Sequence, residues 1–241
     1  MRSLACRGLW VVCTVIALAG AVWAAEPEFA FGGGGPGVGL FLADLADINT
    51  FVDSAGFPVF DGHPILVGGG GRGGVAPGLT YGGAGWGTWI EAEAGALHAE
   101  YGAGLGGFDL GFAFGADEHS LLTIGALIGG GGAELMLMEK AVVTNEGRSP
   151  AGIVVEPTRQ VYDSAFALVA PYVDIQIQLL DWAGLGIRAG YVLPLFELNW
   201  EDAGPLDAPD LALPGPFVRL SLVFGNLADV RPEPSDEDVD L

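Results

Sequence analysis

Apolar and polar residues alternate with a period of two along several segments, a pattern typical of β-strands that bury one face. Between positions 173 and 179 every odd residue is aliphatic, and the even ones are Asp174, Gln176 and Gln178. The same alternation runs through 185–191 and 218–224, where Arg188 and Arg219 stand on the polar side. The pattern predicts about eight strands, near 28–42, 64–73, 78–93, 97–115, 121–139, 163–180, 184–200 and 215–225.

One segment has a helical pattern instead. From Leu42 to Ala55 the large apolar residues recur at intervals of three and four, and Gly56 follows as a stop signal. We therefore expect a single short helix in the connection between the first and second strands.

The strand 97–115 changes phase in its middle. Its apolar residues are odd-numbered up to Leu105 and even-numbered from Phe108 onward, with Gly106 and Gly107 between them. A β-bulge at the glycine pair would keep all the large side chains on one face of a bending sheet. The sequence thus predicts a bulge at this point.

Long and short connections alternate along the chain. The segments 43–63, 140–162 and 201–214 are long, those near 74–77, 116–120 and 181–183 are short, and the turn near Gly95 is the exception. An antiparallel up-and-down meander would gather the long loops at one end, as in outer-membrane barrels. We expect an all-β fold that closes as a barrel, with strand 215–225 paired to strand 28–42.

If the sheet closes as a membrane barrel, the polar residues of the last strands should face its interior. In a membrane barrel, the lumen would receive Asp174, Gln176, Gln178, Arg188 and Arg219, while the aliphatic residues between them would face lipid. A pair of Asp174 with either arginine would then pack the lumen. The opposite orientation would indicate a soluble barrel with an apolar core.

Composition narrows the class of protein. The chain has 241 residues, 51% of them hydrophobic and 41 of them glycine, which argues against disorder and against a helical bundle. A net charge of −21 makes nucleic acid an improbable partner. Three glycine runs, 32–35, 68–71 and 129–132, fall within strands or at their edges. They predict a belt without side chains, either for tight coiling of the sheet or to leave room inside.

The two ends of the chain have the composition of separate segments. Residues 1–24 combine a basic start, an apolar stretch and a small-residue cleavage site, as in a secretory signal peptide. Its removal takes away Cys6 and Cys13, so the mature chain has no disulfide. We expect a single domain over 25–225 and a disordered acidic tail over 226–241.

In strand number, alternation, loop asymmetry and signal peptide, the chain resembles the small eight-stranded outer-membrane barrels of bacteria. The resemblance implies a non-enzymatic cell-envelope protein with a structural, adhesive or small-pore role, and membrane lipid as its partner. The alternative is a secreted or periplasmic soluble β-barrel or sandwich that binds an apolar small molecule. Five aromatic residues are candidates for interfacial girdles in the first case: Trp86, Trp89, Tyr172, Tyr191 and Trp200.

Candidate chemistry is sparse. The motif GxSxG and a phosphate-binding loop are missing from the sequence, so we expect neither an enzyme nor a cofactor. A two-residue turn at Gly95-Ala96 would place Glu93 opposite His98 and Glu91 opposite Glu100, all on one face. Such a group could hold a divalent cation, or it could be the solvated tip of a hairpin.

Overall fold

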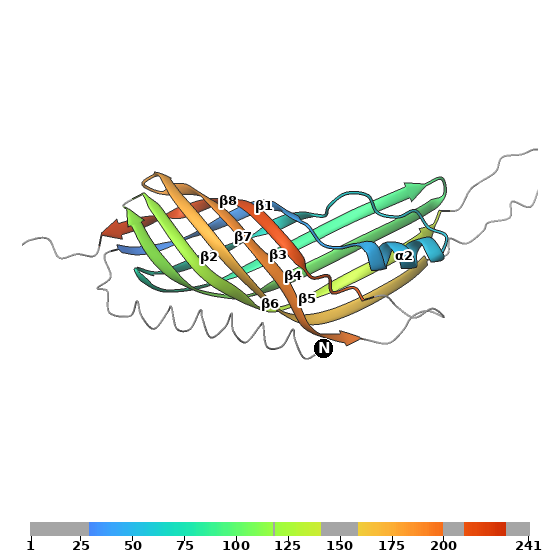
Figure 1. Cartoon of the computed structure of the whole chain (residues 1–241). Helices are drawn as coiled ribbons and strands as arrows, with labels where there is room; N and C mark the ends of the chain where they lie inside the picture. The colour runs from blue at the N-terminus through green and yellow to red at the C-terminus, as the bar shows by residue number, and fades with distance from the viewer. Residues whose placement is uncertain (1–28, 118, 141–158, 200–209, 230–241) are drawn as a thin grey trace, which may run out of the picture.

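The computed structural model describes residues 29–117, 119–140, 159–199 and 210–229. They form eight strands and one helix (Figure 1). The elements are β1 (Phe29–Phe41), α2 (Ala46–Ser54), β2 (Ile65–Ala76), β3 (Gly78–Ala94), β4 (Leu97–Asp117), β5 (Ser120–Glu139), β6 (Arg159–Leu180), β7 (Ala183–Asn199) and β8 (Gly215–Asp229). The predicted number, order and approximate limits of the strands are confirmed.

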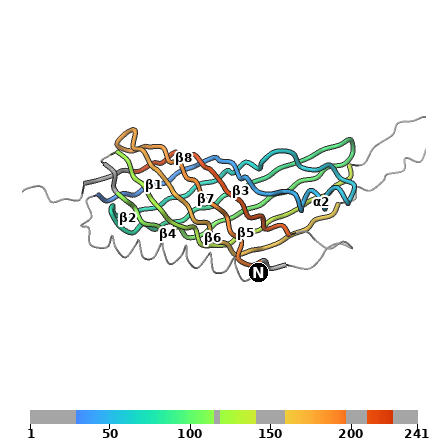
Figure 2. Tube along the Cα trace, in the orientation of Figure 1, coloured from blue at the N-terminus to red at the C-terminus, as the bar shows by residue number. Residues whose placement is uncertain are grey.

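The strands form a closed antiparallel barrel in which each strand pairs with its neighbours in sequence. Closure comes from β8, which pairs with β1 from Phe29 opposite Asp229 to Phe41 opposite Phe217. The short turns after β2, β4 and β6 lie at one end, and α2 lies at the other (Figures 1 and 2). The predicted all-β meander and its closure are therefore confirmed.

The outer surface of the barrel is apolar on all eight strands. Ile187 on β7 is 50% exposed and its cross-strand neighbour Leu220 on β8 is 47% exposed. Every strand adds large exposed apolar residues, among them Val38, Val67, Tyr81, Phe108, Ile128 and Ile175. A continuous exposed surface of this kind is far larger than the apolar patches of soluble monomers. Among the described residues, no helix is long and apolar enough to span a bilayer.

The barrel wall is taller on one side. Strands β4 and β6 have 21 and 22 residues, whereas β1 and β2 have 13 and 12. Near the long-loop end of the tall wall, the outer face becomes acidic, with Glu91, Glu93, Glu100, Glu134 and Asp163. The inner face at the same level is apolar, with Leu135, Leu137 and Tyr162 fully or almost fully buried. The two faces thus exchange polarity along the barrel axis.

The exchange of polarity between the inner and outer faces explains the change of phase in β4. The bulge predicted at Gly106 and Gly107 is wrong. Gly106 and Gly107 pair in unbroken register with both β3 and β5, and β4 shifts register only between Gly115 and Asp117. Tyr101 therefore points inward, and Phe108, seven residues later, points outward and is 52% exposed. The apolar side chains change face because their apolar surroundings change from the interior at the long-loop end to the outer surface.

The helix α2 fills the interior at the long-loop end. Ile48 and Val52 are completely buried, and the Phe51 ring makes an edge contact with Tyr162 of β6 at 5.2 Å between centroids. Tyr101 donates a hydrogen bond of 3.0 Å to the carbonyl of Leu211, which holds the segment before β8 against the same wall. The helix and this segment close the long-loop end of the barrel.

The helix is shorter than the predicted Leu42–Ala55. Its first turn begins at Ala46, whose amide donates a 3.0 Å hydrogen bond to the Asp44 carboxylate. The residues before the helix continue from β1 with a non-helical backbone, because the Leu42 amide donates a hydrogen bond to the carbonyl oxygen of Pro216. Residues ahead of the helix are therefore held by the barrel wall.

The glycine runs align across neighbouring strands as the predicted belt. Gly34 pairs with Gly71, Gly71 with Gly83, and farther round the barrel Gly107 pairs with Gly129. Some inward-facing glycines of the belt leave room for aromatic side chains: a Cβ on Gly131 would lie 2.8 Å from the Phe166 ring. Others lie against neighbouring backbone: a Cβ on Gly129 would clash with the Gly106 carbonyl oxygen. Both predicted uses of the belt, close packing of the sheet and room inside it, are therefore present.

At its C-terminal end the barrel extends farther than predicted. Residues 226–229 continue β8 and pair with the beginning of β1, so they are not part of a disordered tail. Four backbone pairs with β1, as far as Asp229, account for the difference. The predicted signal peptide and the rest of the acidic tail, 230–241, lie outside the described residues.

Candidate functional site: a charged layer inside the barrel

A layer of charged side chains crosses the middle of the barrel. The alternation of each strand turns one member inward: Arg72 on β2, Asp109 on β4, Asp174 on β6, Arg188 on β7 and Arg219 on β8. Each of the five residues is at most 7% exposed. Burial of this many charges is tolerated only when they are paired and hydrogen-bonded.

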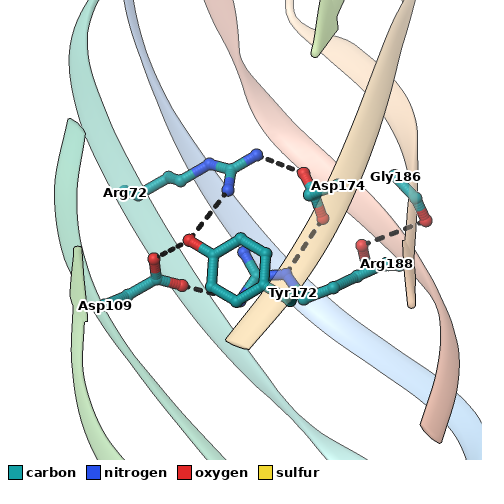
Figure 3. Close-up of polar contacts among 7 residues, drawn as sticks. Arg72, Asp109, Tyr172, Asp174, Gly186 and Arg188 are labelled. Atoms are coloured by element: carbon teal, nitrogen blue, oxygen red, sulfur yellow. Dashed lines mark hydrogen bonds and ion pairs between the residues drawn. The ribbon is translucent and has the colours of Figure 1, made fainter. Parts of the chain in front are cut away.

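Four of these residues form a connected network with Tyr172 (Figure 3). Asp174 accepts hydrogen bonds from the guanidinium groups of both Arg72 and Arg188, the latter at 3.0 Å. Arg188 also donates to the other carboxylate, Asp109, at 2.6 Å. The Tyr172 hydroxyl donates to Asp109, and the Arg188 guanidinium lies 3.8 Å from the centroid of the Tyr172 ring. The network therefore ties β2, β4, β6 and β7 together across the lumen.

Arg219 differs from the other arginines. It lies directly opposite Arg188 in the β7–β8 register, and its guanidinium stacks over the Trp86 ring at 3.8 Å. Among the described side chains, no carboxylate forms an ion pair with it. Of the two predicted partners of Asp174, Arg188 is paired with it and Arg219 is not.

The two predicted lumen glutamines lie nearer the short-turn end and are half-buried. Gln178 donates hydrogen bonds to the carbonyls of Leu180 and Gly225, at 2.6 and 3.2 Å, and so links β6 to β8. Gln176 lines a small cavity beside the charged layer. The structure thus places the polar side of 173–179 toward the interior.

Sequence reasoning did not single out Arg72 or Asp109, and it assigned Tyr172 to an interfacial girdle instead of the lumen. Arg72 is the lone charge in the run GGGGRGG, and Asp109 is the lone charge between Phe108 and Leu110. A single charge in an otherwise apolar or glycine-rich strand was the available signal. At Asp109 this signal was obscured by the predicted bulge. The bulge put Phe108 and Leu110 on the same face as Leu105 and therefore put Asp109 on the other face.

Buried side chains occupy both ends of the described part of the lumen. The short-turn end holds the buried apolar residues Phe29, Ala76, Ala113 and Leu121, and the long-loop end holds α2 and its contacts. Two cavities beside the charged layer have volumes of about 20 Å³ each. That is enough for a single water-sized occupant.

The predicted hairpin tip forms with the expected register, Glu93 opposite His98 and Glu91 opposite Glu100. Gly95 takes a positive φ of 62° in the turn. The His98 Nδ1 lies 3.0 Å from Glu93, and its Nε2 lies 3.6 Å from Glu100.

The tip does not assemble the predicted cation site. The ammonium group of Lys140 forms a 2.6 Å ion pair with Glu93, so a protein cation already neutralises that carboxylate. Among the residues that the structure describes, no group of three or more His, Cys, Asp or Glu side chains is arranged to hold a metal ion.

The aromatic candidates divide between the two faces. Trp89 and Tyr191 are 54% and 41% exposed on the outer surface, as an interfacial girdle requires. Trp86 and Tyr172 point into the lumen instead, because they occupy inward positions of their strands. Trp200 lies outside the described residues.

The closed meander, the apolar outer surface and the buried charged layer define the class of fold: a small eight-stranded antiparallel β-barrel with the inside-out polarity that a membrane-spanning barrel requires. No protein-family model and no curated protein matches the chain. Among solved structures it is similar to Ail, the attachment invasion locus protein of Yersinia pestis, at 11% identity and a TM-score of 0.43. That match covers 83% of this chain and 99% of the other.

Two further solved structures match the chain: a second structure of Ail and, with a lower TM-score, a protease. Ail in complex with the heparin analogue sucrose octasulfate matches at 12% identity and a TM-score of 0.43, over 83% of this chain and 99% of that one. The outer membrane protease OmpT from Escherichia coli matches at 9% identity and a TM-score of 0.31, over 84% and 95%. At identities of 9–12% and TM-scores below 0.5, these similarities give no information on the ligand or activity of this chain.

Proposed function

We propose that the protein is a non-enzymatic, non-conducting barrel of the outer membrane with a structural or adhesive role. The observation that carries this proposal is the two-faced barrel wall, which is apolar outside and charged inside at the same level. A water-soluble barrel that binds an apolar ligand would need the reverse arrangement. Lipid is the partner that fits the outer surface.

The filled interior argues against the small-pore role. A solute would have to pass the apolar cluster at the short-turn end, the cross-linked arginines and aspartates, and α2. The side chains that form these layers are buried, and those of the charged layer bond across the lumen. The proposed role is therefore one of anchoring and surface presentation.

The tall wall formed by β3 to β6 is the part best suited to presentation. Its outer face at the long-loop end is acidic, and its inner face is made rigid by the packed helix α2. In the orientation typical of outer-membrane barrels, long loops face the outside of the cell. The wall would then project an acidic surface beyond the membrane.

Conductance measures whether the lumen is closed. The purified mature chain, reconstituted into a planar bilayer, is expected to give no steady single-channel currents in 1 M KCl. The reason is that both ends of the lumen and its charged layer are filled. A porin reconstituted in the same way serves as the positive control. Stable unitary currents that scale with the number of inserted barrels would contradict the proposal.

Cysteine labelling measures the location and orientation. Because the mature chain contains no cysteine, single cysteines introduced as Ala94→Cys at the β3–β4 tip and Asp181→Cys in the β6–β7 turn are unique labels. A membrane-impermeant maleimide is expected to label the first variant on intact cells and the second only after the outer membrane is permeabilised. Equal labelling in a soluble fraction would favour the ligand-binding alternative.

A further inference from the structure

The charged layer contains one more cation than anions. Three buried arginines, Arg72, Arg188 and Arg219, face two buried aspartates, Asp109 and Asp174. Both aspartates are occupied by Arg72, Arg188 and Tyr172, so the uncompensated charge is on Arg219. A buried charge without a counter-charge is strongly destabilising.

The layer also contains hydrogen-bond donors without acceptors. The Nε atoms of Arg72 and Arg219 are buried and have no hydrogen-bond partner, although the two residues are only 6% and 7% exposed. Unpaired buried donors of charged groups are costly, and each points to a missing acceptor.

A cavity adjoins both of these arginines. Its lining includes all three arginines of the layer, the amide-bearing Gln176 and the hydroxyl-bearing Ser221, together with backbone of the glycine runs. Asp109 is the single carboxylate in this lining, and it already binds Arg188 and Tyr172. The cavity volume of about 20 Å³ is enough for an occupant of the size of a water molecule or a monatomic ion.

We propose that this cavity is a binding site for a small inorganic anion of the size of chloride, with Arg219 and Arg72 as its principal ligands. The anion would neutralise the third arginine and accept the hydrogen bonds that their Nε atoms lack. Arg188 and Arg219, which face each other across β7 and β8, would then share a counter-ion instead of repelling one another. A water molecule would satisfy the donors but leave the charge uncompensated.

Unfolding at constant ionic strength tests the site. The mature chain in detergent micelles is unfolded with urea while chloride replaces the bulky anion gluconate. The urea midpoint of the wild type is expected to rise and saturate with chloride, because a ligand of the folded state stabilises it by mass action. In Arg219→Gln the apparent chloride affinity should fall by about 10- to 100-fold, as for the loss of a charged hydrogen bond.

The matched control is Arg159→Gln, which makes the same change at an exposed position of β6. It should keep the chloride dependence of the wild type. In gluconate alone, Arg219→Gln should be at least as stable as the wild type, because it removes the unpaired charge. A purely structural arginine would instead make that variant less stable in both salts.

Bromide gives a direct readout on the unmodified protein, independent of whether the variant folds. Crystals grown in bromide should show an anomalous peak within hydrogen-bond distance of Arg219 Nε. A site filled by water alone, or an equal chloride dependence in Arg219→Gln and the wild type, would overturn the proposal. Either result would leave the closed barrel and its membrane location untouched.

Discussion

Replacing Asp174 by asparagine is expected to destabilise the folded barrel by about 3–5 kcal/mol. Asp174 is 1% exposed and accepts hydrogen bonds from both Arg72 and Arg188. Without its charge, three buried arginines would share the single carboxylate of Asp109. Breaking a buried ion pair by removing one partner leaves an uncompensated charge, which is the source of the large effect.

Equilibrium unfolding in urea, with the protein in micelles or lipid vesicles, measures this loss. Asp163→Asn is the matched control, since Asp163 lies on the same strand but is exposed on its outer face. The control should change the free energy of unfolding by no more than about 0.5 kcal/mol. A loss at Asp174 as small as that of the control would mean that the network does not hold the barrel together.

Introducing arginine on the outer surface by Leu220→Arg is expected to destabilise the membrane-inserted barrel by about 2–4 kcal/mol. Leu220 is 47% exposed and is paired with Val38 on one side and Ile187 on the other, both of which are half exposed. A guanidinium at this position would have to be taken into the hydrocarbon layer. The effect should therefore be seen as a lower free energy of folding into lipid vesicles and as slower insertion.

Glu134→Arg is the control for this prediction. It places the same side chain on the outer face of β5, in the acidic region near the long-loop end. There the arginine would stay in water beside Asp163, so little change in stability is expected. If Leu220→Arg had no effect, or improved the solubility of a detergent-free protein, the apolar surface would not be in contact with lipid.

The sequence alone determined the secondary structure and the topology of this protein. Alternation reports which side chains share a face, and the face is a local property of an extended backbone. The spacing of long and short connections reports which strands are neighbours, because adjacent antiparallel strands need only a short turn. These local signals predicted the eight strands and the hairpin register at Glu93 and His98. The closure of β8 on β1 followed from the meander, because closure removes the two exposed edges of the sheet.

Alternation did not determine which apolar face lies inside. In β4 the apolar residues change from odd to even at Gly106, and a bulge or a change of surroundings accounts equally well for that pattern. The register shows a change of surroundings: apolar groups face α2 at one level and the outer surface at another. This distinction depends on where a loop helix from the other side of the barrel packs, and that is a long-range contact.

Only the tertiary structure decided how the charges are partnered. Arg72 and Asp174 are separated by 102 residues, and Asp109 and Arg188 by 79, yet they meet because the closed barrel brings facing walls together. Strand spacing places Arg219 beside Arg188, but the barrel puts the Trp86 ring, and no carboxylate of the described residues, against its guanidinium. Pairing across a lumen depends on the curvature and stagger of the whole sheet, and no local pattern of residues carries that information.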